Sequence, residues 1–267
     1  MIRGITIQSF SGRSAVRRPL RPAPAASVAG LLLLVVGAGV AAAESAPQLA
    51  LDAPGWELTR DEDGIRSYKR VVTGSPLLAF RGEAVIKAPI TRVLSVALDT
   101  ERVGEWIPGV AESTVVRWIK EPVEYVQYSR FDAPWPVRDR IFLSRVVMAV
   151  DPHTYTTEIR YHNIPETLDR DRGIQGYTGG SYYILRPFDQ GRSTYFVGVS
   201  VADPRGSVPA WLVNWMGASW AHRTLRLLAR QVAKPDVSDL PMIEPLFAGF
   251  EPSPPSLSIP EMPTAGD

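Results

Sequence analysis

The segment from residue 203 to 232 most constrains what this chain can fold into. It is the last long apolar run, and it holds three of the seven tryptophans, Trp211, Trp215 and Trp220. Pro209 suits the first turn of a helix, because the N–H that proline lacks has no partner there anyway. Apolar residues then recur at three- and four-residue steps, which predicts an amphipathic helix of about 24 residues, roughly 36 Å long. Such a helix can cross the whole width of a small sheet.

The segments before this helix alternate apolar and polar residues, which is typical of strands with one buried face. The expected elements, in chain order, are strands at 65–72 and 77–87, a helix at 90–98, a helical turn at 100–105, and strands at 112–120, 124–131, 139–150, 154–162, 176–187 and 193–203. Short turns and the lack of strand–helix alternation argue against a parallel sheet. We therefore predict an α+β fold, in which the long helix covers the concave face of a curved antiparallel sheet. We expect a lipid-sized cavity between the two layers.

Residues 1–43 have the pattern of an export signal. Residues 1–24 contain five arginines and no acid, residues 25–43 are small or apolar, and the run ends in Ala41-Ala42-Ala43. A basic start, an apolar middle and small residues at the exit predict a cleaved secretory signal and a periplasmic protein. The alternative is a retained membrane anchor, since the apolar run approaches the roughly 20 residues that a span needs.

Composition narrows the classes of function. Without the five arginines of residues 1–43, the chain keeps 24 basic and 28 acidic residues, so the net charge changes from +1 to −4. This balance gives no support for nucleic-acid binding, which needs a clustered basic surface. The chain has no cysteine, which excludes disulfides, thiol nucleophiles and thiolate metal sites.

The remaining residues divide into three parts. Residues 44–53 are predicted to be a short linker, and residues 54–233 a single domain of ordinary size. Residues 234–267 contain eight prolines and six acids, which predicts a disordered tail, although Met242-Ile243 and Leu246-Phe247 can dock locally. We expect the protein to be a monomer.

Catalysis, metal binding and cofactor binding receive little support. His153, His162 and His222 fall in a predicted turn, strand and helix, without the spacing of metal ligands. The serines lack the context of a nucleophile elbow. The three glycines between residues 176 and 180 precede no helix, so they predict a bend in the sheet and not a phosphate loop.

The second informative stretch is 131–145. Pro134, Trp135 and Pro136 form a stiff loop with a large aromatic side chain at its tip. In the strand that follows, Arg145 shares its predicted face with four apolar residues, Ile141, Leu143, Val147 and Ala149. An arginine on an apolar face is costly unless it is paired. Its guanidinium therefore either reaches the edge of the sheet or is a buried charge that orients the head group of a ligand.

These motifs resemble the START family of lipid-transfer domains. The resemblance is carried by the loop residues Pro134, Pro136, Val137, Asp139 and Arg140, by the helix entry Asp203–Pro209 with Trp211, Asn214 and Trp215, and by Ala88-Pro89-Ile90, Trp106–Val110 and Glu112. It spans residues 54–233. It implies a helix-grip fold with an apolar tunnel that binds one lipid or sterol without catalysis.

The resemblance also implies roles for particular residues. Arg145 falls at the position of the arginine that some family members place in the tunnel, while residues 125–131 of the preceding strand contain no acid to pair with it. Glu158, on the next strand, is a possible substitute. The expected ligand-binding residues are Arg145, Tyr128, Tyr183, Trp211, Trp215, Met216 and Ser219. Trp135 and Pro136, or the loop 163–173, are expected to form a gate with the long helix.

Two other functions are compatible with the sequence. One is an enzyme of the polyketide cyclase or aromatase kind on the same fold, with Arg145, Tyr128, Tyr183 and Glu158 as the candidate polar residues. The other is a membrane-tethered interaction module, if residues 25–43 are retained. For the binding protein, the expected partners are a lipid or sterol-like small molecule and a membrane that it contacts transiently.

Overall fold

The computed structural model describes residues 49–133, 135, 137–166 and 172–251. All described residues belong to one compact unit. The predicted signal at residues 1–43 and the gate residue Pro136 lie outside the described residues.

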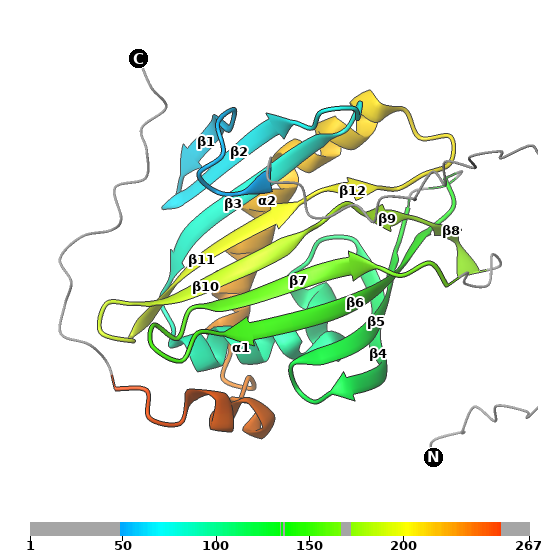
Figure 1. Cartoon of the computed structure of the whole chain (residues 1–267). Helices are drawn as coiled ribbons and strands as arrows, with labels where there is room; N and C mark the ends of the chain where they lie inside the picture. The colour runs from blue at the N-terminus through cyan, green and yellow to red at the C-terminus, as the bar shows by residue number, and fades with distance from the viewer. Residues whose placement is uncertain (1–48, 134, 136, 167–171, 252–267) are drawn as a thin grey trace, which may run out of the picture. The chain divides into compact units, whose positions relative to one another are not determined.

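The described residues form a curved antiparallel sheet with a long helix laid across one face (Figure 1). The strands are β1 (Glu57–Glu62), β2 (Ile65–Val71), β3 (Leu78–Ile86), β4 (Val110–Lys120), β5 (Glu124–Phe131), β6 (Arg140–Val150), β7 (Thr157–Asn163), β8 (Ile174–Gln175), β9 (Tyr177–Thr178), β10 (Tyr182–Phe188), β11 (Ser193–Ser200) and β12 (Ala202–Asp203). The helices are α1 (Ile90–Leu98), η2 (Thr100–Glu105), α2 (Ala210–Val232) and η4 (Pro241–Phe247). This arrangement confirms the predicted α+β class.

The main sheet has the strand order β1-β2-β3-β11-β10-β7-β6-β5-β4, and all neighbours on this path are antiparallel. The short β8 pairs in parallel with β6, and β9 pairs with β12. The strand β1 is missing from the sequence-based prediction because all six of its residues are exposed, so it has no apolar alternation. The predicted strand 176–187 is interrupted by Gly180, which has a φ of +93°. The glycines therefore bend the chain here, as expected.

The helix α2 packs closely on β2 and β3 because glycines allow it. A Cβ atom on Gly82 of β3 would lie 2.9 Å from Cδ1 of Leu225. On the other side of the contact, a Cβ atom on Gly217 would lie 2.2 Å from the ring of Phe80. At distances this short, either the contacting side chain or the helix would have to shift.

The two halves of α2, all of whose residues are described, pack differently. Its buried residues all lie in the second half: Ala221, His222, Thr224, Leu225, Leu228, Gln231 and Val232. In the first half, Trp211 and Trp215 are 69% and 71% exposed. Asn214 joins this half to the turn between β2 and β3, where its side chain bonds the N–H of Leu78 and the carbonyl of Pro76. The predicted amphipathic helix is therefore fully buried on one face only in its second half.

A buried ionic network lies on the face of β3 opposite α2. The Glu83 carboxylate is 2.6 Å from Nη2 of Arg81, and it accepts hydrogen bonds of 2.7 Å from the hydroxyls of Tyr68 and Tyr195. Burial raises the pKa of Glu83, but the Tyr195 hydrogen bond and the Arg81 charge outweigh this effect, so the net pKa is lowered. Glu83 is therefore ionised in the folded protein at neutral pH.

The described part of the predicted linker, residues 49–53, packs on the sheet. Leu49 is buried, and its carbonyl accepts a hydrogen bond of 2.6 Å from the hydroxyl of Tyr182. The Leu51 carbonyl accepts from Arg81 Nη1 at 3.1 Å. This part of the chain is therefore not a free linker, because its leucines add to an apolar cluster on this face.

The beginning of the predicted disordered tail is also folded. The helix η4 packs against α1, with Ile243 and Phe247 buried, and the N–H of Leu240 donates to Ser95 Oγ at 2.8 Å. Residues up to 251 are thus ordered by local apolar contacts, and the prediction of disorder is wrong for this part. Residues 252–267 lie outside the described residues.

Candidate ligand-binding site

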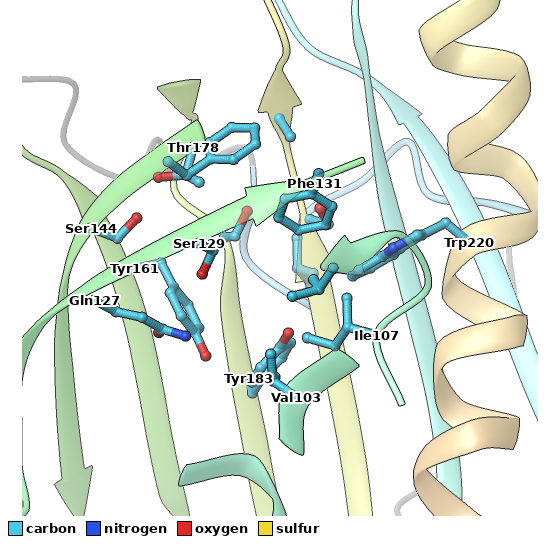
Figure 2. A pocket seen from close by; sticks show the side chains of 16 residues that line it. Val103, Ile107, Gln127, Ser129, Phe131, Ser144, Tyr161, Thr178, Tyr183 and Trp220 are labelled. Carbon is cyan, nitrogen blue, oxygen red and sulfur yellow. The ribbon is translucent and has the colours of Figure 1, made fainter. Parts of the chain in front are cut away.

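A cavity of about 110 Å³ lies between the inner face of the sheet, η2 and α2 (Figure 2). Its apolar lining residues are Val103, Ile107, Val110, Phe131, Phe142, Val199, Ala202 and Trp220. Its polar lining residues are Gln127, Ser129, Ser144, Tyr161, Thr178, Ser181, Tyr183 and Ser200. The polar residues come from the strands, except Ser181, which directly precedes β10, whereas Ile107 and Trp220 form part of the opposite, apolar wall (Figure 2).

Strand register explains which side chains reach the cavity. Paired residues of antiparallel strands point to the same face of the sheet. Gln127 of β5 pairs with Ser144 of β6, and Ser129 pairs with Phe142. These positions face the cavity. The alternate residues of β5 and β6 consequently face the outside of the sheet.

The polar wall contains a chain of short contacts. Gln127 Nε2 donates to Ser113 Oγ at 2.8 Å, and Ser113 Oγ is 3.2 Å from Ser129 Oγ. The other amide atom, Gln127 Oε1, is buried without a hydrogen-bond partner among the described residues, and the same is true of Thr178 Oγ1. Leaving such atoms unpaired is costly, so each can accept a hydrogen bond from a molecule in the cavity.

Two tyrosines complete the polar wall. The rings of Tyr161 and Tyr183 meet edge to face, with centroids 5.5 Å apart. Burial raises the pKa of the Tyr161 hydroxyl well above its usual value, and burial likewise raises the pKa of Tyr183. Both phenols are therefore neutral at physiological pH. None of the described residues that line the cavity is charged.

The comparisons with known proteins agree with this architecture. The family model of the START domain matches residues 38–230. The chain belongs to the START domain family. An uncharacterized protein of Pseudomonas aeruginosa is 30% identical over 187 residues, which is 69% of this chain and 89% of that protein. The resemblance seen in the sequence is thereby confirmed.

Solved structures give the same result. The crystal structure of a STAR-related lipid transfer protein from Xanthomonas axonopodis is 28% identical, with a TM-score of 0.59, and the match covers 67% of this chain and 99% of that one. Human StAR-related lipid transfer protein 5 shares the fold at 17% identity and a TM-score of 0.59, over 68% of this chain and 88% of its own. The helix-grip fold of this START domain is thus confirmed.

In this START domain Arg145 does not face the cavity. Its side chain is 51% exposed, and its Nη2 is 2.5 Å from the carboxylate of Glu124. The strand β6 buries residues on both faces, since Ile141 and Leu143 belong to an apolar cluster on the outer face. The period-two pattern therefore could not tell which face is the inner one, and the prediction of Arg145 as a head-group contact is wrong. Glu158, the possible substitute acid, is partly exposed and pairs with Arg160.

The other expected site residues divide between the cavity and the surface. Tyr183 lines the cavity. Tyr128 lies on the outer face, where its ring centroid is 4.7 Å from the guanidinium of Arg172. The four expected ligand-binding residues on the first half of α2 have exposed side chains: Trp211, Trp215, Met216 and Ser219. The expected gate residue Trp135 is 92% exposed, and much of the alternative gate loop, residues 167–171, lies outside the described residues.

Apart from Tyr183, the sequence did not point to the polar residues of the cavity wall. Gln127 and Ser129 alternate with apolar residues along β5, a pattern that usually marks the solvated face of a strand. Their burial depends on the curvature of the sheet and on η2 and α2, which close the cavity. In the part of the chain that the structure describes, no group of three or more histidine or acidic side chains could hold a metal ion. No helix there is long and apolar enough to cross a membrane.

Proposed function

We propose that this START domain reversibly binds one lipid, or a similarly hydrophobic molecule, in the cavity between the sheet and α2, without catalysis. The observation that carries the proposal is a partly open cavity between the sheet, η2 and α2, with one wall apolar and no charged residue among the described lining residues. The Xanthomonas relative is named a lipid transfer protein, which supports the same class of ligand. Burial of apolar surface, worth about 25 cal/mol per Å², would drive binding.

Ligand entry must enlarge the cavity. Its volume is about 110 Å³, whereas pockets for small-molecule ligands usually measure about 300–1,000 Å³. We infer that the first half of α2 is the wall that moves, because the buried residues of this helix all lie in its second half. Trp220, at the boundary of the two halves, lines the cavity and would move with this wall.

The loop after β5 is the second part of the proposed gate. It leads into Arg140, which donates hydrogen bonds to the carbonyls of Pro204 and Arg205 in the segment before α2. Movement of the first half of α2 would therefore displace this loop through the hydrogen bonds of Arg140. Trp135 at its tip and the exposed Trp211 and Trp215 would support transient contact with a membrane, since tryptophan favours the interface between water and lipid.

Binding without catalysis is favoured over cyclase or aromatase chemistry. Acid–base catalysis on a reactive chain needs ionisable groups that converge on it, with pKa values near the working pH. The described lining offers two phenols, Tyr161 and Tyr183, whose pKa values burial raises. Neither phenol is suited to remove a proton at neutral pH.

Native mass spectrometry with two matched variants tests the proposal. Ser144→Phe would fill much of the cavity. A cavity of about 150 Å³ accommodates one benzene molecule, and this cavity, at about 110 Å³, is smaller than that. Ala149→Phe places the same ring on the exposed outer face of the same strand. We expect the wild-type and Ala149→Phe proteins to carry one lipid per chain, and Ser144→Phe to carry none. Ligand-free wild type after exposure to lipid mixtures would contradict the proposal.

We also infer export to the periplasm, from the signal-like pattern of residues 1–43. Cell fractionation, together with the intact mass of the mature chain, tests this inference. Loss of the N-terminal segment from a soluble periplasmic protein is expected. A full-length chain in the membrane fraction would favour the tethered alternative.

A further inference from the structure

The polar wall of the cavity has one deep hydrogen-bonding atom that the protein itself leaves unused. Gln127 is 8% exposed, its Nε2 donates to Ser113, and its Oε1 has no partner among the described residues. Figure 2 shows the Gln127 side chain at one end of the polar wall and Thr178 at the other. Thr178, the other residue with an unpaired oxygen, is only partly buried. Gln127 is therefore the deeper anchor.

The chemistry of this atom defines its partner. An amide oxygen accepts hydrogen bonds and cannot donate them, so it needs an O–H or an N–H from the guest. A carboxylate has no proton to offer at neutral pH, and neither does a fully ionised phosphate.

The rest of the wall gives an ionic head group no counter-charge. No described lining residue is an arginine, lysine, histidine, aspartate or glutamate. Arg145 points outward and is paired with Glu124. Arg140, on the inner face of the same strand, does not line the cavity, and its guanidinium donates to the carbonyls of Pro204 and Arg205. Burying an ion without a partner of opposite charge is strongly unfavourable. Head groups of either sign are therefore disfavoured.

We propose that the cavity selects an uncharged amphiphile whose hydroxyl or amide N–H donates to Gln127 Oε1, and that it discriminates against carboxylates and phosphates of the same chain length. The apolar wall formed by Ile107, Phe131 and Trp220 holds the hydrocarbon part of this molecule. The inference rests on the proposed function and narrows its class of ligand.

A matched series of head groups tests the inference on the wild-type protein. The mature chain is loaded with Nile red, a neutral probe, and 1-dodecanol, dodecanoate and dodecane compete for it at pH 8. Dodecanol is expected to compete about tenfold better than dodecanoate or dodecane. The reason is that losing one buried hydrogen bond lowers the binding constant by about this factor. Dodecanoate or dodecane competing as well as dodecanol would overturn the inference and leave hydrophobic binding standing. If Nile red does not bind and none of the three ligands is detected by native mass spectrometry, both the inference and the proposed function fail.

Two variants assign the selectivity to one atom. Gln127→Leu keeps the shape of the side chain and removes the acceptor, so dodecanol should lose its advantage over dodecane while dodecane binds as before. Tyr128→Phe removes a hydroxyl that is also unpaired, but on the outer face of the same strand, and should leave the selectivity unchanged. Unchanged selectivity in a folded Gln127→Leu protein would overturn the role of Gln127. The wild-type series does not depend on how this variant folds.

Discussion

Asn214 is the residue whose loss should most clearly change the opening of the cavity. Its Oδ1 accepts a hydrogen bond of 2.9 Å from the N–H of Leu78, and its Nδ2 donates to the carbonyl of Pro76 at 3.1 Å. These bonds join the first half of α2 to the turn between β2 and β3. Asn214→Ala removes both bonds without weakening the helix itself, because alanine has the higher helix propensity.

The magnitude follows from the two bonds. Each contributes about 0.5–1.5 kcal/mol net, so the pair holds the first half of α2 closed by about 1–3 kcal/mol. If opening breaks both, the population of the open form rises about 5- to 150-fold, since each 1.4 kcal/mol is a factor of ten. Ligand release through this opening should accelerate by the same factor.

Stopped-flow fluorescence measures this directly. Protein loaded with Nile red is mixed with an excess of unlabelled phosphatidylcholine vesicles, and the release rate is compared between wild type and variants. Ser219→Ala is the matched control, because Ser219 Oγ bonds only its own helix, at the carbonyl of Met216. A release rate for Asn214→Ala within twofold of wild type would refute the assignment of the moving wall to this half of α2.

Three further predictions concern stability and membrane contact. Gly217→Ala should lower the free energy of unfolding by about 1–3 kcal/mol, because its Cβ would meet the Phe80 ring; a variant as stable as wild type in urea would argue against the close packing. Glu83→Gln should cost about 3–5 kcal/mol, because it breaks a buried ion pair. The pKa of Glu83 is lowered from 4.5 in the folded protein, so the ionised carboxylate stabilises the fold fully above pH 4.5. This stabilisation is lost as the pH falls through the folded-state pKa of Glu83. Melting curves from pH 7 to 3 should show this loss in wild type and less of it in Glu83→Gln. Replacing Trp211 and Trp215 by serine should weaken co-sedimentation with vesicles and leave the melting temperature unchanged, since both side chains are exposed; equal sedimentation would show that other residues make the membrane contact.

Periodicity in the sequence predicted most of the fold. Alternation of apolar and polar residues placed most of the strands within a few residues, because a curved sheet still needs one buried face. The strand β1 was missed because an exposed edge strand has no buried face to detect. Helical spacing likewise identified α2, but it could not tell how much of the helix the sheet and α1 would cover.

The site was harder to predict than the fold. Arg145 and Gln127 show why, since a period-two pattern assigns residues to two faces without saying which one is inside. On β6 both faces carry apolar residues, so the exposed Arg145 looked like a tunnel residue. On β5 the inner face carries glutamine and serine, so the cavity wall looked like a solvated surface. Only the positions of η2 and α2 resolve this ambiguity.

Photolabelling in the bound state tests the central claim most directly, namely that the ligand lies between the sheet and α2. A dodecanol analogue with a diazirine in its alkyl chain is bound and irradiated, and the labelled residues are mapped by tandem mass spectrometry. The account predicts adducts on residues of the apolar wall, Ile107, Phe131 and Trp220. Adducts concentrated on the exposed Trp211 and Trp215 would contradict it.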